Sequence, residues 1–167
     1  FYQKDFSASV AIIKPSFKEV EYFTSNNDLI PVMYNLPKFI FILAQQKFEQ
    51  FVVHACGVAD DKRGYLFVAD SGGGKSTIAR LAQSRTILND DRIILRKKKN
   101  KFKIFGTPWA GLMNMTSNRG AEIKDIFFLK KSKTNQIISL NRIEAAKILF
   151  RNIVFFPLNE TDINNAF

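Results

Sequence analysis

Residues 66–77 read LFVADSGGGKST: a short apolar run is followed by three consecutive glycines and a lysine. The apolar run predicts a strand, and the following KSTIARLAQS (75–84) predicts a short helix. A strand that passes through glycines into a helix directs several backbone N–H groups, with the positive end of the helix dipole, into one concavity. The sequence therefore predicts an anion-binding loop here, with an ordinary glycine turn as the alternative.

The residue types in this loop favour nucleotide phosphates over other anions. Gly72, Gly73 and Gly74 carry no Cβ, so their backbone can wrap closely around a phosphate. Lys75 can reach the β- and γ-phosphates, and the Ser76 hydroxyl is placed to bind Mg²⁺. The full phosphate-loop pattern has glycine at its first position, where this chain has alanine. The predicted cofactor-binding residues are Ser71, Gly72, Gly73, Gly74, Lys75, Ser76 and Thr77.

A pair of carboxylates follows the loop at an unusually short distance. Asp90 and Asp91 end the apolar run TILN and lie only one short helix and one strand beyond Lys75. A phosphate loop needs an acid that holds the metal, and most P-loop NTPases place that acid much farther along the chain. The alternative is a polar turn that opens the next hairpin. Because the aspartate pair follows the glycine loop so closely, the metal-holding role is favoured over the polar turn.

His54 lies in VVHACG (52–57), on the strand that precedes the glycine-loop strand. A single histidine among apolar neighbours is usually a core residue whose nitrogens are satisfied. The next strand, however, leads directly into the glycine loop, and an imidazole near a γ-phosphate could support proton transfer. Both interpretations stay open at this stage. Cys56 on the same strand is interpreted as a packing residue.

Apolar periodicity and turn residues outline one α/β domain over residues 1–167, and the missing initiator methionine leaves open whether the chain is complete. Pro31 and Pro37 are expected to interrupt the chain before a helix at 38–50, and Asn141 is expected to cap a C-terminal helix with Glu144 completing a capping box. Strands are expected at 7–14, 20–25, 51–59, 65–69, 85–91, 123–129 and 135–140, with a hairpin at 92–106, an irregular loop at 107–120 and the last helix at 141–152.

The bulk composition limits the function classes. Lys plus Arg (25) minus Asp plus Glu (15) gives a net charge of +10, and much of the excess lies in RKKKNKFK (96–103). A solvated hairpin tip explains that run, and a nucleic-acid-binding surface is the alternative. Cys56 alone cannot form an internal disulfide, no zinc-type cluster is present, and no apolar stretch approaches a membrane span. A reducing cytoplasmic location without membrane partners is therefore expected.

Residues 51–95 resemble the ATP-binding catalytic domain of HPr serine kinase/phosphorylase and its relatives, which share a nucleotide fold with phosphoenolpyruvate carboxykinase. The resemblance rests on a histidine strand, the GGGKS loop and a paired aspartate one helix later, in that order. Residues 105–129 resemble the extension in the HPr-kinase-like branch that includes peptide-modifying kinases. The implied fold is an α/β P-loop nucleotide-binding domain with a mixed sheet, whose catalytic core is 51–95.

The resemblance implies a Mg-ATP-dependent kinase that phosphorylates a serine-type hydroxyl. Lys75 and the glycines would hold ATP, while Ser76 and Asp90 would hold Mg²⁺. Asp91, helped by His54, would take the proton of the attacking hydroxyl. The division of roles between the two aspartates stays open. The implied catalytic residues are Asp91, His54 and Lys75.

The expected phosphoacceptor is a peptide, a small protein or a small molecule, and nucleic acid is not expected as a partner. Trp109 and Arg119 lie in the 107–120 loop as candidate substrate residues; a core-capping ring and a surface ion pair are their alternatives. Thr77 stands where the bifunctional enzymes have glutamate, so the reverse phosphorylase reaction is left open, as is homo-oligomerisation. The competing function class is a P-loop ATPase switch, or a nucleic-acid-binding module that uses the basic 96–103 hairpin.

Overall fold

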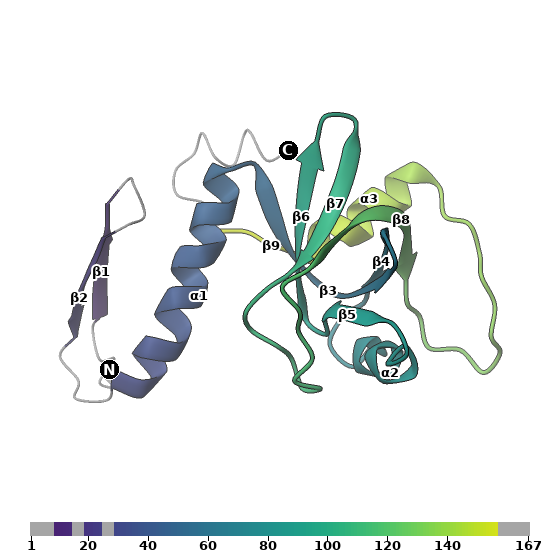
Figure 1. The fold of residues 1–167 in the computed structure, drawn as a ribbon, viewed down its shortest axis with the longest axis horizontal. Coiled ribbons are helices and arrows are strands. Elements are labelled where there is room, and N and C mark those ends of the chain that lie inside the picture. Colours follow the sequence, from purple (N-terminus) through teal and green to yellow (C-terminus); the bar gives the residue numbers. More distant parts are fainter. Residues whose placement is uncertain (1–8, 15–18, 25–28, 157–167) are drawn as a thin grey trace, which may run out of the picture.

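The computed structural model describes residues 9–14, 19–24 and 29–156. This part of the chain forms three helices and nine strands (Figure 1). Their bounds are β1 (Ser9–Ile13), β2 (Val20–Thr24), α1 (Leu29–Lys47), β3 (Gln50–Asp60), β4 (Arg63–Val68), α2 (Lys75–Leu81), β5 (Thr86–Asn89), β6 (Arg92–Lys98), β7 (Lys101–Gly106), β8 (Gly120–Phe128), α3 (Arg142–Arg151) and β9 (Ile153–Val154). No helix among the described residues is both long and apolar enough to cross a bilayer.

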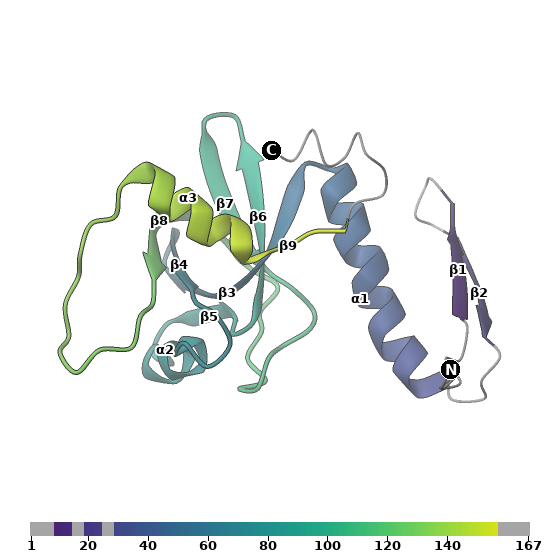
Figure 2. The same ribbon diagram turned by 180° about the vertical axis from the view of Figure 1, so that it is seen from behind.

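The long strand β3 organises a mixed sheet of seven strands. Its first half pairs with β6 on one side and β9 on the other, and its second half pairs with β5 and β4. Strand β4 continues to β8 in a parallel pairing, β8 pairs with β7, and β7 pairs with β6. The pairings of β3, β4, β8, β7 and β6 therefore close into a ring (Figures 1 and 2). The expected mixed α/β class is confirmed at this level.

The interior of the ring holds the main hydrophobic core. Successive side chains of a strand point to opposite faces, so alternate residues of β3 line the interior. Val53, Ala55 and Ala59 of β3 pack there with Leu66 and Val68 of β4. The core is completed from the other strands by Leu88, Ile93, Leu95, Ile104 and Ala121. Since these residues come from all sides of the ring, the core requires the ring to close.

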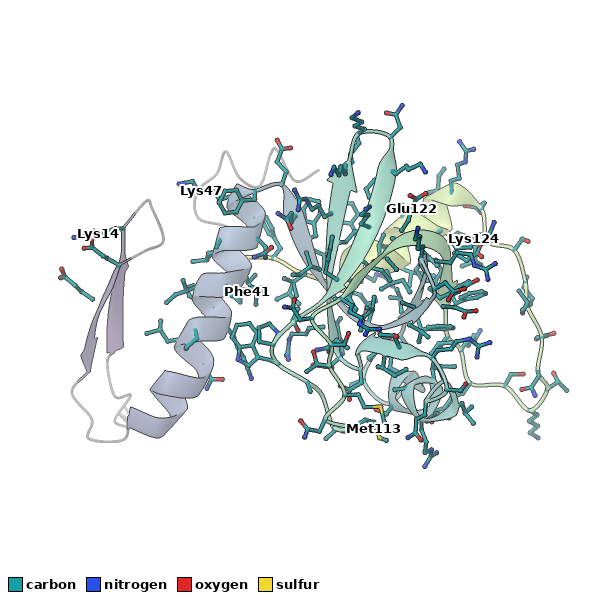
Figure 3. All side chains as sticks on the ribbon, in the orientation of Figure 1. Lys14, Phe41, Lys47, Met113, Glu122 and Lys124 are labelled. Carbon is teal, nitrogen blue, oxygen red and sulfur yellow. The ribbon has the colours of Figure 1, made fainter. Side chains whose placement is uncertain are left out.

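Helix α2 covers the outer face of β3 with a second, smaller cluster. Cys56 and Val58 are the outward-facing residues of β3, and they pack against Ala79 of α2 and Ile87 of β5. Met113 and Met115, from the loop after β7, lie against the same cluster. Figure 3 labels Met113 beside α2. This packing fixes the start of α2, and with it the end of the glycine loop, to the centre of the sheet.

Helix α1 differs from the expectation that prolines interrupt the chain. It runs from Leu29 to Lys47, contains Pro37 in its interior, and ends before the expected residue 50, where β3 has already begun. Proline cannot donate its own helical hydrogen bond, which usually breaks a helix. In this helix, which contacts β3, the side chains of Ile42 and Leu43 are buried. The packing of an apolar helix face commonly outweighs the conformational preference of a single residue such as proline. The boundary prediction was wrong for this reason.

The chain between β8 and α3 also differs from expectation. Residues 135–140 form no strand, their side chains are exposed, and Ile137 is 87% exposed. Strand β7 pairs only with residues 120–122 of β8, yet residues 135–140 do not add to β8 as a further strand, and the segment arches away from the ring (Figures 1 and 2). The expected cap of α3 is confirmed, because Asn141 Oδ1 accepts the Glu144 N–H at 2.9 Å. Strand β9 was not expected.

Most other expected elements are confirmed with shifts of a few residues. The early strands correspond to β1 and β2, and the strand–turn–strand unit before the glycines corresponds to β3 and β4. The basic run forms the tip of the β6–β7 hairpin, which projects at the end of the molecule opposite α2 (Figures 1 and 2). The basic tip is therefore remote from the glycine loop.

Candidate functional site

The topology brings the glycines and the aspartates to one edge of the sheet. Strands β4 and β5 flank β3 and both run antiparallel to it, so they run in the same direction. Gly57 of β3 pairs with Leu66 of β4 and with Asn89 of β5. The glycine loop follows β4, and Asp90 and Asp91 directly follow β5. Two motifs that are separate in the sequence therefore leave the sheet at the same end, on either side of β3.

The glycine loop is folded around the ammonium group of Lys75. Lys75 is 7% exposed, and its Nζ donates to the carbonyl oxygens of Ala69 at 2.6 Å and Asp70 at 3.1 Å. Burial lowers the pKa of Lys75, and the negative charges of Asp91 and Asp70 oppose that shift. Gly74 has φ 107°, a left-handed conformation that a residue with Cβ rarely adopts. The loop thus needs glycine where it enters α2.

The hydroxyl residues around Lys75 are accessible to different degrees. Ser71 and Thr77 are exposed, and Ser76 is half-buried in the first turn of α2. Within the described part of the chain, the Ser76 hydroxyl makes no hydrogen bond. Its oxygen is therefore available to a ligand beside the loop. The predicted cofactor-binding residues 71–77 comprise the end of the glycine loop and the first turn of α2.

Asp91 lies between an imidazole and a guanidinium. Its Oδ1 is 2.9 Å from His54 Nε2, and its Oδ2 is 2.8 Å from Arg92 NH1. The hydrogen bond from His54 is the main cause that lowers the pKa of Asp91, and the charges of Arg92 and Lys75 act in the same direction against burial. Asp91 is therefore an ionised carboxylate at neutral pH. The structure places His54 in contact with Asp91, and Lys75 lies near enough for its charge to act on Asp91; the catalytic roles of the three residues stay a prediction.

Asp90 has different surroundings, although it is the next residue in the chain. It is 2% exposed; its Oδ1 accepts the N–H of Gly111 at 2.7 Å, and its Oδ2 accepts that of Met113 at 2.8 Å. A Cβ on Gly111 would lie only 2.6 Å from the Asp91 Cβ, so glycine is required for the loop to approach this closely. Asp90 thus anchors the loop that follows β7.

Asn89 is a functional candidate that the sequence reasoning missed. Its side chain is fully buried; Oδ1 accepts the N–H groups of Asp91 and Arg92, each at 2.8 Å. Its Nδ2 donates to the carbonyls of Thr107 at 3.1 Å and Trp109 at 3.0 Å. One amide therefore fixes the turn that carries both aspartates and ties it to the next loop. The only sequence signal was an asparagine before Asp-Asp, a residue that commonly shapes turns.

The two candidate substrate residues lie in different surroundings. The Trp109 ring packs edge-on against Phe41 of α1, with ring centroids 5.1 Å apart. Arg119 donates to the Thr86 hydroxyl at 3.5 Å, at the start of β5, whereas the aspartates follow its end. Trp109 is linked to the site through its carbonyl and Asn89, whereas no described contact joins Arg119 to Lys75 or Asp91.

Cys56 lies beneath the site without taking part in its charge network. Its side chain is fully buried, and burial, reinforced by the charge of Asp90, raises the pKa of its thiol to about 12. The thiol is therefore neutral at physiological pH, and Cys56 packs against α2 as expected. Within residues 9–14, 19–24 and 29–156, no three His, Cys, Asp or Glu residues form a metal-binding group.

Residues 18–161 match the family model described as SynChlorMet cassette protein ScmC. The chain belongs to the ScmC family. The matched segment contains the whole ring of strands, α2, α3 and every residue of the candidate site. None of the curated proteins matches the chain significantly. The family description names no reaction, so the function is argued from the site.

Proposed function

We propose that this ScmC-family chain is a Mg-ATP-dependent kinase, which transfers the γ-phosphoryl group to a serine-type hydroxyl of a peptide, a small protein or a small molecule. The observation that carries the proposal is the convergence of the Lys75 loop and the His54–Asp91 pair at one sheet edge. A loop that can hold phosphates and a carboxylate that can accept a proton are the two parts that phosphoryl transfer to a hydroxyl needs.

The loop fits the phosphates of ATP. Lys75 donates to two backbone carbonyls of its own loop, and phosphate oxygens would replace these acceptors for the same ammonium group. The glycines leave room for phosphate oxygens against the backbone N–H groups at the start of α2. These features, with the order of the three motifs, support a P-loop nucleotide-binding fold similar to that of HPr kinase.

The oxygen donors beside the loop fit Mg²⁺ bound together with a nucleotide. Such a cation usually takes one or two protein oxygens and completes its shell with phosphates and water, so a cage of three acidic residues is not required. Ser76 offers a hydroxyl without a described partner, and Asp90 and Asp91 keep lone pairs beyond their present hydrogen bonds. Bound Mg²⁺ supplies charge neutralisation on the phosphates.

Asp91 would accept the proton of the acceptor hydroxyl as the oxygen forms its bond to phosphorus. Its lowered pKa keeps it ionised at neutral pH, and it is more accessible than Asp90, which is nearly fully buried. His54 would hold the carboxylate in position through the Nε2–Oδ1 contact while Asp91 takes up the proton and becomes neutral. Asp91 is thus the proposed base, and Asp90 is proposed to act through the metal or the loop.

The test is an acceptor screen with radiolabelled ATP, followed by mass spectrometry of the product. The expected result is a labelled phosphate ester on a hydroxyl group of a peptide, protein or metabolite. The competing ATPase switch would release inorganic phosphate and label no acceptor, and nucleic acid would stimulate the release if the basic hairpin binds it. That result would contradict the kinase proposal.

A further inference from the structure

A pocket of about 390 Å³ opens beside the Asp91 network, on the side of α3 and β9. Its lining includes His54 and Arg92, which both contact Asp91, and Arg151 and Asn152 at the end of α3. Ile153, Val154 and Phe155 complete the lining with apolar side chains. In Figure 2 the chain passes from α3 through β9 across the ring at this place. The pocket therefore shares two residues with the proposed reaction centre.

The charge in the pocket is positive. Arg92 and Arg151 each contribute a guanidinium, and no Asp or Glu belongs to the lining. The ion pair with Asp91 holds Arg92 in place, whereas Arg151 is exposed and has no acidic partner within the described chain. An unpaired guanidinium and a fixed one in the same lining supply donors that match an anion bound in the pocket.

Backbone hydrogen bonds join the end of α3 and β9 to β3 beside the pocket. The His54 N–H donates to the Asn152 carbonyl at 2.7 Å, and the Asn152 side chain donates to Ile148 within α3 at 3.0 Å. Val52 and Val53 pair with the two residues of β9. These bonds hold the end of α3 next to β3, so Arg151 belongs to a backbone segment that is fixed beside His54.

We infer that this pocket binds a carboxylate of the phosphoacceptor, so that the substrate is an acidic hydroxyl compound. The inference rests on the proposed kinase function. The planar forks of Arg92 and Arg151 suit a carboxylate, and the apolar residues of the lining suit the aliphatic part that carries it. Arg151 would select acceptors by binding their carboxylate, since no described contact joins it to the proposed base.

A binding experiment without ATP tests this inference separately from the kinase proposal. The probes are two blocked peptides, Ala-Asp-Ser-Asp-Ala and its Asn-for-Asp counterpart, titrated into isotope-labelled protein and followed by amide NMR shifts. The acidic peptide should shift the amides of 151–155 and bind about tenfold more tightly than the neutral one, because charge-assisted bonds to guanidinium are stronger than neutral ones. Arg151→Gln should remove that preference.

The matched control is Lys147→Gln, which removes an equal charge from the same helix outside the pocket lining. This variant should keep the preference for the acidic peptide. Equal binding of the two peptides, no binding of either, or an equal loss in both variants would overturn the inference. Tighter binding of inorganic phosphate than of the acidic peptide at the same amides would also overturn it. None of these outcomes bears on ATP binding, so the kinase proposal is tested independently.

Discussion

The Nε2 atom of His54 lies 2.9 Å from Oδ1 of Asp91, and the two residues come from neighbouring segments of the sheet rather than from one motif. His54 pairs with Arg92 in the β3–β6 ladder, so the residue before Arg92 is brought within reach of the imidazole. Arg92 in turn holds the other carboxylate oxygen. The orientation of Asp91 is therefore built into the register of the sheet, and the predictions below depend on it.

Mg-ATP should stabilise the folded protein, and Lys75→Ala should remove most of the effect. A ligand at ~100 times its dissociation constant adds ~2.7 kcal/mol to the free energy of unfolding. The measurement is the thermal midpoint with and without Mg-ATP. Lys62→Ala, an exposed lysine in the turn between β3 and β4, is the control and should respond like the original chain. A chain whose midpoint does not move with Mg-ATP would contradict the nucleotide site.

Asp91→Asn should separate nucleotide binding from transfer. Lys75 and the glycine loop are unchanged in this variant, so the Mg-ATP shift should largely persist. The variant loses the proton acceptor, and a positioned base typically contributes 10²–10⁴-fold, so the transfer rate should fall by about two to four orders of magnitude. The rate is measured with the acceptor that the screen identifies. Transfer at the original rate would show that another group takes the proton.

Asp90→Asn should lower the stability of the folded protein, whereas Asp91→Asn should lower the rate of phosphoryl transfer. Both oxygens of Asp90 accept backbone N–H groups, so an amide would turn a donor toward the Gly111 or the Met113 N–H. Leaving a buried donor unsatisfied costs about 1–3 kcal/mol. Urea denaturation should show this loss in the absence of any ligand. Unchanged stability would mean that Asp90 does not anchor the loop.

The His54–Asp91 contact predicts a pH dependence at the acid end. The pKa of Asp91 is lowered in the folded state, so its contribution to stability is fully present above the ordinary carboxyl value of 3.8. The contribution is lost as pH falls below that value and through the lowered one. Denaturation curves from pH 5 downward should therefore show a steeper loss in the original chain than in Asp91→Asn. Parallel curves would contradict the lowered pKa.

Phe41→Ala should shift the emission of Trp109, the single tryptophan, to longer wavelength. The edge contact with Phe41 shields the indole ring, and its loss admits water. Phe39→Ala is the matched control, because Phe39 packs against Phe156 instead, with ring centroids 4.7 Å apart. The fluorescence of that variant should stay unchanged. Equal shifts in both variants would indicate a general change in α1 rather than loss of the Trp109 contact.

Local patterns in the sequence predicted the local parts of this molecule. The glycine loop before α2, the basic hairpin tip and the Asn141 cap of α3 each depend on a few adjacent residues, whose backbone preferences and hydrogen bonds act over one turn. The same holds for the pairing of β3 with β4 through a short turn. The candidate residues Lys75, His54 and Asp91 could be named for this reason.

Only the tertiary structure decided how these parts meet. The parallel pairing of β4 with β8 closes the ring, and neither strand carries a local signal for its distant partner. Residues 135–140 form no strand despite their apolar pattern, because they do not pair with any strand of the described sheet. Asn89 is buried at the end of β5, where its one amide joins two loops. Sequence patterns report preferences of neighbouring residues, whereas burial and edge pairing depend on which distant segments remain available, and here these decided the details of the site.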